Sequence, residues 1–200
     1  MPTIYMTPVA FVDMILAVHL NPFEVSGLGK IIPVGEDFHV SEVVLYKQKC
    51  SPFVTKMDEV VIGQYWTELI RAGKSAEIPM WRFWWHSHVY SRTEWSMVDD
   101  ATFRDWRENS VAEWWVSVVL NKLGDIRTRV DYFHPSRPTF HLSNYKLSGG
   151  KPIVVTDKNI DLEALYRERE SRMSQILAER VDNYPLLANP LAFLCRDEND

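Results

Sequence analysis

The sequence predicts an α/β (α+β) domain in which strands and helices share one core. Strand-like and helix-like patterns alternate along most of its 200 residues, a length typical of one domain. Apolar residues make up 46% of the chain and charged residues 24%, as in ordinary globular proteins, so the composition argues against disorder. We therefore expect a core large enough to support a functional site.

The N-terminal part predicts a helix followed by a β-hairpin. Thr7 is a candidate N-cap with Pro8 at the first helical position, and the helix is expected to stop before Pro22. Two strand-like segments follow, at residues 25–34 and 37–48. A turn beginning at Gly35 joins them, which predicts an antiparallel pair.

The middle of the chain predicts a helix from Asp58 to Gly73, with these residues as cap and terminator. The segment 80–88 (MWRFWWHSH) is short and very apolar, which favours a strand buried on both faces. We then expect a helix from about Met97 to Glu108. It is followed by a pair of strands, at residues 113–121 and 126–133, with a turn at residues 122–125 between them.

The C-terminal part is less regular. Residues 134–152 are rich in Pro, Ser and Gly and predict loops around one or two short strands. Residues 161–181 predict a long polar helix with an incomplete apolar stripe, which either packs on the edge of the domain or serves a partner. The residues after Asn183 give no clear prediction.

Charge and composition exclude several classes of function. A net charge of −5 lacks the basic patch of a nucleic-acid-binding protein, and no segment is apolar enough to span a membrane. Cys50 and Cys195 are the only cysteines, which disfavours a disulfide framework or a cysteine-based zinc site. The first residues do not resemble a signal peptide, so we expect a cytoplasmic protein.

The segment 84–100 (WWHSHVYSRTEWSMVDD) carries the candidate site. On a strand, His86 and His88 project from the same face, so both imidazoles can reach one metal ion. Asp99 lies where the next helix begins and can turn back toward the strand end. Two nitrogens and one carboxylate leave a fourth position open, as in catalytic zinc sites. Alternatively, Ser96 and Asp99 form a capping box, which leaves the two histidines unexplained.

These residues resemble a family motif. His86 and His88 are followed by seven residues, then Ser96, two further residues and Asp99, which resembles the signature of the JAMM (MPN-plus) zinc metalloproteases. That family also carries an upstream glutamate soon followed by glycine, and Glu24 matches it in place and surroundings. The resemblance covers about residues 7–134.

The resemblance implies a fold, a cofactor and a set of roles. The fold would be a mostly antiparallel curved sheet flanked by helices, similar to the cytidine deaminases, with residues 1–155 as the catalytic domain and 156–200 as a helix and tail packed on it. His86, His88 and Asp99 would bind one Zn²⁺ per chain. Glu24 would be the general base and later the acid, and Ser96 would stabilise the oxyanion.

The implied activity is hydrolysis of a peptide or isopeptide bond, with the C-terminal tail of a ubiquitin-like or sulfur-carrier protein as substrate. Alternatives are a non-enzymatic scaffold, a latent enzyme activated by a partner, and a peptidase of phage tail assembly. A zinc deaminase is disfavoured because the Pro-Cys-x-x-Cys half of its motif is missing. Among the tryptophans Trp84, Trp85 and Trp95, we expect Trp95 to be the best placed to line the substrate groove.

Overall fold

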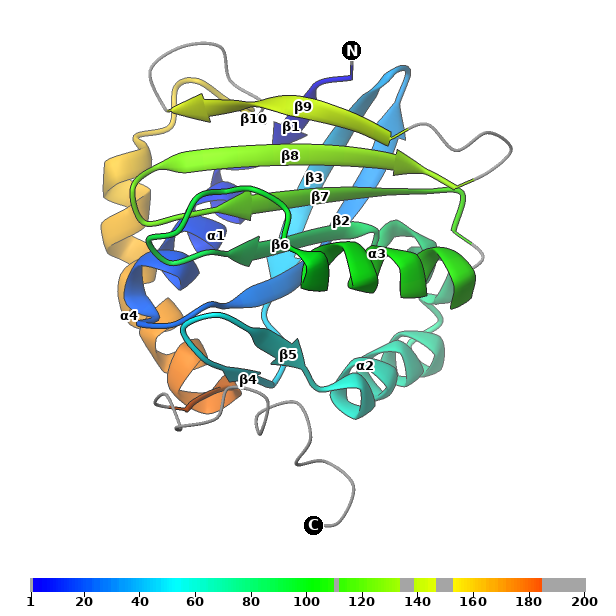
Figure 1. The fold of residues 1–200 in the computed structure, drawn as a ribbon, viewed down its shortest axis with the longest axis horizontal. Coiled ribbons are helices and arrows are strands. Elements are labelled where there is room, and N and C mark those ends of the chain that lie inside the picture. The colour runs from blue at the N-terminus through cyan, green and yellow to red at the C-terminus, as the bar shows by residue number, and fades with distance from the viewer. Residues whose placement is uncertain (1, 110–111, 134–138, 147–152, 185–200) are drawn as a thin grey trace.

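The computed structural model describes residues 2–109, 112–133, 139–146 and 153–184. Its main sheet has the strand order β10-β1-β3-β2-β6-β7-β8-β9 and curls across the molecule (Figure 1). In this order the strands are β10 (Ile153–Val155), β1 (Ile4–Met6), β3 (Asp37–Val44), β2 (Ser26–Val34), β6 (Phe83–Ser87), β7 (Trp114–Leu120), β8 (Asp125–Tyr132) and β9 (Thr139–Lys146).

The sheet is mixed, which makes the expectation of a mostly antiparallel sheet correct only in part. Four neighbouring pairs are antiparallel, namely β2–β3, β2–β6, β7–β8 and β8–β9. Three pairs are parallel, namely β1–β3, β1–β10 and β6–β7. Parallel neighbours need a crossover connection, and α3 (Met97–Asn109) supplies it between β6 and β7.

The first helix and the hairpin form as predicted. Helix α1 (Pro8–Leu20) begins at Thr7, whose hydroxyl accepts a hydrogen bond from the Ala10 N–H, and it has Pro8 at its first position. Strands β2 and β3 are paired through the turn at Gly35, whose φ of 63° suits glycine. The second strand is shorter than predicted because the chain leaves the sheet after Val44.

Strand β6 is buried along its whole length, as predicted, because β2 and β7 flank it and both of its faces are covered. Its large side chains need space on β2. A Cβ added at Gly27 would lie 2.7 Å from the Trp85 ring, and one at Gly29 would lie 2.6 Å from Phe83. These two glycines therefore let the bulky strand pack against its neighbour.

Helix α2 (Glu59–Arg71) is capped by the Asp58 carboxylate and followed by Gly73 at a φ of 72°, as predicted. A short 3-10 helix, η1 (Ser75–Met80), leads from it into β6. Two short strands, β4 (Gln48–Cys50) and β5 (Thr55–Met57), were not predicted. They form a small separate sheet with β11 (Val181–Asn183), in the order β11-β4-β5.

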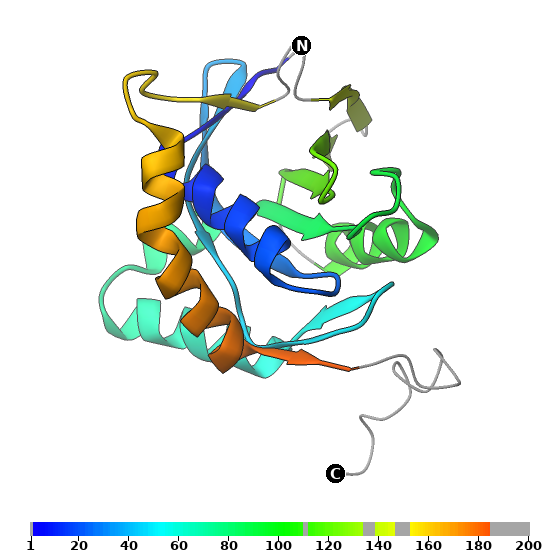
Figure 2. The same cartoon turned by 90° about the vertical axis from the view of Figure 1, so that its left-hand side faces the viewer.

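The long C-terminal helix α4 (Leu162–Arg180) packs beside α1, which decides between the two alternatives left by its sequence (Figure 2). Arg169 donates two hydrogen bonds to Asp13 of α1, at 2.5 and 2.7 Å. Met173 and Leu177 from the apolar stripe are buried in the core. The residues after Tyr184, which include Cys195, lie outside the described residues.

Two apolar clusters lie on opposite faces of the sheet. The larger contains Phe83 and Trp85 and packs under α1 and α4. The smaller is rich in aromatic residues, contains Trp84 and Phe103, and lies under α2 and α3. Within the described residues, no helix combines the length and the apolar character needed to cross a membrane.

Candidate metal centre

The end of β6 and the start of β2 meet through antiparallel pairing. Ser26 is the register partner of His86, so Glu24, two residues before Ser26, lies beside the chain near His88. Glu24 lies 62 residues before His86 in the sequence. The pairing brings the two segments to one cleft, which Glu24, His86, His88 and Asp99 all line.

Three side chains converge closely enough to hold a metal ion. The Nε2 atoms of His86 and His88 lie 3.1 Å apart. The Asp99 carboxylate oxygens lie 3.1 Å from Nε2 of His86 and 3.5 Å from Nε2 of His88. In a tetrahedral site with bonds of about 2.0–2.1 Å, neighbouring ligand atoms lie about 3.3 Å apart. The three predicted ligands are buried and arranged at the spacing that such a site requires.

The backbone fixes the tautomer of His88. Its Nδ1 lies 2.8 Å from the carbonyl oxygen of Arg92, and because a carbonyl can only accept, Nδ1 carries the proton. The Nε2 lone pair of the neutral ring is therefore free to bind a metal, as in many metal-ligating histidines. Val89, directly after His88, has a φ of 42°, unusual for a β-branched residue, in the tight bend that returns the Arg92 carbonyl to the imidazole.

Asp99 takes part in a capping box while it contacts the histidines. The Ser96 N–H donates to Asp99 Oδ2 at 2.6 Å, and the Asp99 N–H donates to Ser96 Oγ at 3.2 Å. The predicted capping box is therefore present, and the same cap holds the carboxylate against the imidazoles. Arg129 of β8 holds the same helix start through an ion pair with Asp100, at 2.7 Å.

The charges of the three groups are coupled. Burial lowers the pKa of His86, and its bond to Asp99 opposes this only in part. Burial also acts to lower the pKa of His88, but the bonds to Asp99 and Arg92 outweigh it, so that pKa is raised. Burial acts to raise the pKa of Asp99, yet the two imidazoles and the Ser96 N–H hold it well below its usual range. Asp99 is therefore an anion at neutral pH, as a metal ligand must be.

Glu24 is 8% exposed, and the chain around it is held on both sides. Its N–H donates to the Ser51 carbonyl at 3.0 Å, and the next N–H, of Val25, donates to the Ser87 hydroxyl at 3.0 Å. Burial raises the pKa of the Glu24 carboxyl to about 8, against a smaller opposing effect of His88. A buried carboxyl of this kind can exchange a proton near neutral pH.

Two positioning residues were missed by the sequence analysis. Ser87 faces away from the histidines, is fully buried and joins β6 to the Glu24 segment. The Gln48 side chain bonds both backbone groups of Ser26, at 2.9 and 2.8 Å, and accepts a bond from Thr55 at 2.8 Å. A buried serine or glutamine has no distinctive sequence pattern, so no signal in the chain could have revealed them.

The cleft at these residues has a volume of about 500 Å³. Trp95 lines it, as predicted, and so does Trp84, whose ring stacks on His86 with 4.4 Å between centroids. Trp85 lies on the other face of β6, fully buried in the larger cluster, so it does not wall this cleft. Ser96 lines the same cleft as the four predicted polar residues.

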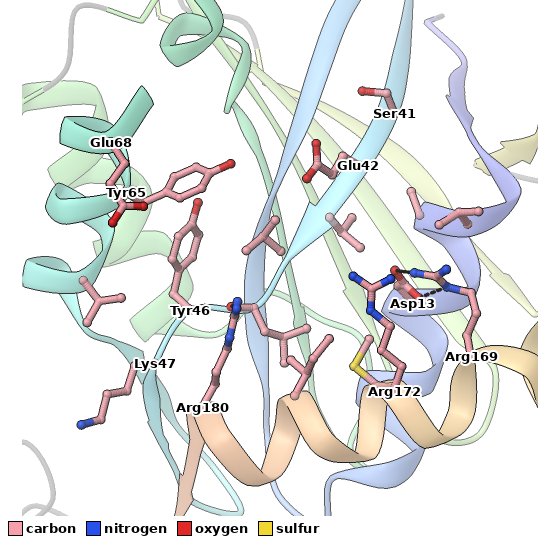
Figure 3. A pocket seen from close by; sticks show the side chains of 18 of the residues that line it. Asp13, Ser41, Glu42, Tyr46, Lys47, Tyr65, Glu68, Arg169, Arg172 and Arg180 are labelled. Atoms are coloured by element: carbon pink, nitrogen blue, oxygen red, sulfur yellow. Dashed lines mark hydrogen bonds and ion pairs between the residues drawn. The ribbon is translucent and has the colours of Figure 1, made fainter. Parts of the chain in front are cut away.

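A larger groove, of about 740 Å³, lies elsewhere. It runs between α2 and α4 over the end of β3, and Figure 3 shows Tyr46 and Tyr65 on one side and three arginines on the other. Arg169 is paired with Asp13, and Arg180 donates to the Leu45 carbonyl at 2.6 Å. This groove is not lined by His86, His88 or Asp99. The candidate site is therefore the smaller cleft, which all three residues line.

Comparisons with known proteins give no family. No protein-family profile matches the sequence, and no curated protein does. One similar solved structure is the solution structure of a protein from Desulfitobacterium hafniense, with 16% sequence identity and a TM-score of 0.48. The match covers 82% of this chain and 98% of that chain. The resemblance to the JAMM metalloproteases therefore stays a prediction.

Proposed function

We propose that this chain is a zinc-dependent peptidase or isopeptidase of the JAMM type. The convergence of His86, His88 and Asp99 at ligand spacing, beside the buried Glu24, is the observation that carries the proposal. Two imidazoles and one carboxylate are the donor set that zinc accepts, and they leave a fourth position for the reaction. When bound, zinc would supply Lewis acidity and lower the pKa of a coordinated water.

The protein residues supply the proton transfer and the charge stabilisation. Glu24 accepts a proton as the nucleophile forms and returns it to the amine, which leaves poorly until it is protonated. Ser96 Oγ accepts the Asp99 N–H, and its own proton remains available to donate to an oxyanion. Both groups line the same cleft as the proposed ligands, which supports these roles.

The proposed substrate is the extended C-terminal tail of a ubiquitin-like or sulfur-carrier protein. Strand β5 is at one edge of the small sheet, and within the described residues it pairs with β4 alone. Thr55 at its start lines the cleft, so a tail added along this edge would lead its carbonyl group toward the histidines. The identity of the partner rests on the family resemblance.

The test combines metal analysis with cleavage. We expect about one zinc per purified chain, removed by a chelator, and cleavage of at least one member of a panel of ubiquitin-like fusion proteins. His88→Ala should lose both the zinc and the cleavage. A chain that binds zinc but cleaves no fusion or peptide would support a scaffold instead, and a chain that binds no zinc would overturn the proposal.

A further inference from the structure

A second cavity, which we call the tryptophan pocket, lies beside the cleft lined by Glu24, His86, His88 and Asp99, which we call the metal cleft. It has a volume of about 630 Å³, within the range of about 300–1,000 Å³ typical of ligand sites, and lies between α2, α3 and β5. Five tryptophan rings line it: Trp66, Trp81, Trp84, Trp106 and Trp115. Such a lining favours an apolar or aromatic occupant.

The two cavities share a wall. Thr55, Trp84 and Thr102 line both the metal cleft and the tryptophan pocket. Trp84 has its ring against His86 and also contacts Trp106 edge-on, with 5.2 Å between centroids. The two cavities are therefore neighbours, so a molecule bound beside His86 lies next to the pocket.

Three of the tryptophans that line the pocket have indole N–H groups without a protein acceptor among the described residues. The indole N–H groups of Trp81, Trp84 and Trp115 are buried and make no hydrogen bond within the described residues. Trp81 and Trp84 are 3% and 5% exposed. A buried indole N–H usually has a partner, and the backbone carbonyls of an extended peptide are acceptors of the right kind.

A glycine of helix α2, Gly63, borders the pocket. Gly63 lies in the middle of α2, where glycine is the least favourable residue apart from proline, and it lines the pocket. A Cβ at this position would meet no atom within 4 Å, so packing within the protein does not require the glycine. The space beside Gly63 is consistent with room left for an occupant.

We propose that the tryptophan pocket selects a peptide substrate with an aromatic side chain close to the scissile bond. The side chain would pack among the tryptophan rings, and the free indole N–H groups would bond the adjacent peptide carbonyls. This inference rests on the proposed peptidase function. It adds a preference for one substrate side chain, which the resemblance to the JAMM metalloproteases does not imply. It predicts selectivity for a bulky residue at one position of the substrate.

The test is a series of fluorogenic decapeptides with a glycine-serine background and a single phenylalanine moved along them. At one position, kcat/KM should rise at least tenfold over the glycine peptide. Gly63→Phe, which fills the pocket, should remove this preference mainly through KM. Gln64→Phe is the matched control, because the adjacent side chain lines the α2–α4 groove instead and should keep the preference.

Binding in the presence of a chelator separates this inference from the proposed function. In NMR spectra of the wild-type chain, the preferred peptide, or the full series if none is cleaved, should shift the indole N–H signals of Trp84, Trp106 and Trp115. The signal of Trp114, which packs on Phe38 outside the pocket, should not move. Such shifts without hydrolysis would keep the pocket and reject the peptidase. Hydrolysis with equal rates for phenylalanine and glycine at every position would reject the pocket and keep the peptidase.

Discussion

The two faces of β6 differ in what they bury. Phe83 and Trp85 point into the larger cluster under α1 and α4, where side chains fill the space left by glycines of β2. Trp84 and His86 point to the other face, where the two cavities and the other candidate metal ligands lie. One face of the strand therefore stabilises the fold, and the other is available for chemistry. Substitutions on the two faces should separate stability from activity.

The largest expected effect is on the rate of hydrolysis. Glu24→Gln keeps the size of the side chain but removes the proton acceptor, so kcat should fall by about a hundred- to ten-thousand-fold while the zinc content stays near one per chain. Glu42→Gln, an exposed carboxylate of β3, is the control and should leave the rate unchanged. Undiminished cleavage by Glu24→Gln would remove this residue from the mechanism.

The next effect is on the free energy of unfolding. Trp85→Ala deletes a fully buried ring from the larger cluster and should cost about 3–5 kcal/mol in denaturant titrations. Trp106→Ala removes a half-buried ring that borders the tryptophan pocket, so it should cost about 1–2 kcal/mol. Equal losses for the two variants would contradict the division between the two faces.

Removal of the metal should produce a smaller change in stability. An ion that binds only the folded state at a free concentration of a hundred times Kd adds about 2.7 kcal/mol, which raises Tm by about 5–10 °C in a protein of this size. Thermal unfolding with zinc or with a chelator measures this difference. His88→Ala should show no response to zinc, and a wild-type Tm that zinc leaves unchanged would argue against the site.

These comparisons also show which features could be predicted. Local signals were sufficient for the caps at Thr7 and Asp58, the turn at Gly35 and the buried strand before His86, because each depends on neighbouring residues. The parallel pairing of β6 with β7 was not predicted, because it depends on where α3 crosses the sheet.

The same distinction holds within the candidate site. The three candidate ligands and Glu24 belong to a set of side chains with a recognisable spacing in the sequence. The acceptor for His88 is instead the backbone carbonyl of Arg92, which any residue could provide, and the hydroxyl that holds the Val25 N–H is one serine among many. Candidate site residues can be predicted from sequence when their residue types and spacing are distinctive. Hydrogen bonds that depend on the backbone can be recognised only in the folded structure.

The smallest expected effect compares two helix caps. Asp58 caps α2, and Ser96 belongs to the reciprocal cap at the start of α3. Asp58→Ala and Ser96→Ala should each lower the free energy of unfolding by about 1 kcal/mol, measured in denaturant. Only Ser96→Ala should also lower kcat, because Ser96 alone lines the metal cleft and can donate to an oxyanion. An equal loss of activity in both variants would show that Ser96 acts through stability alone, since Asp58 is not among the residues that line the metal cleft.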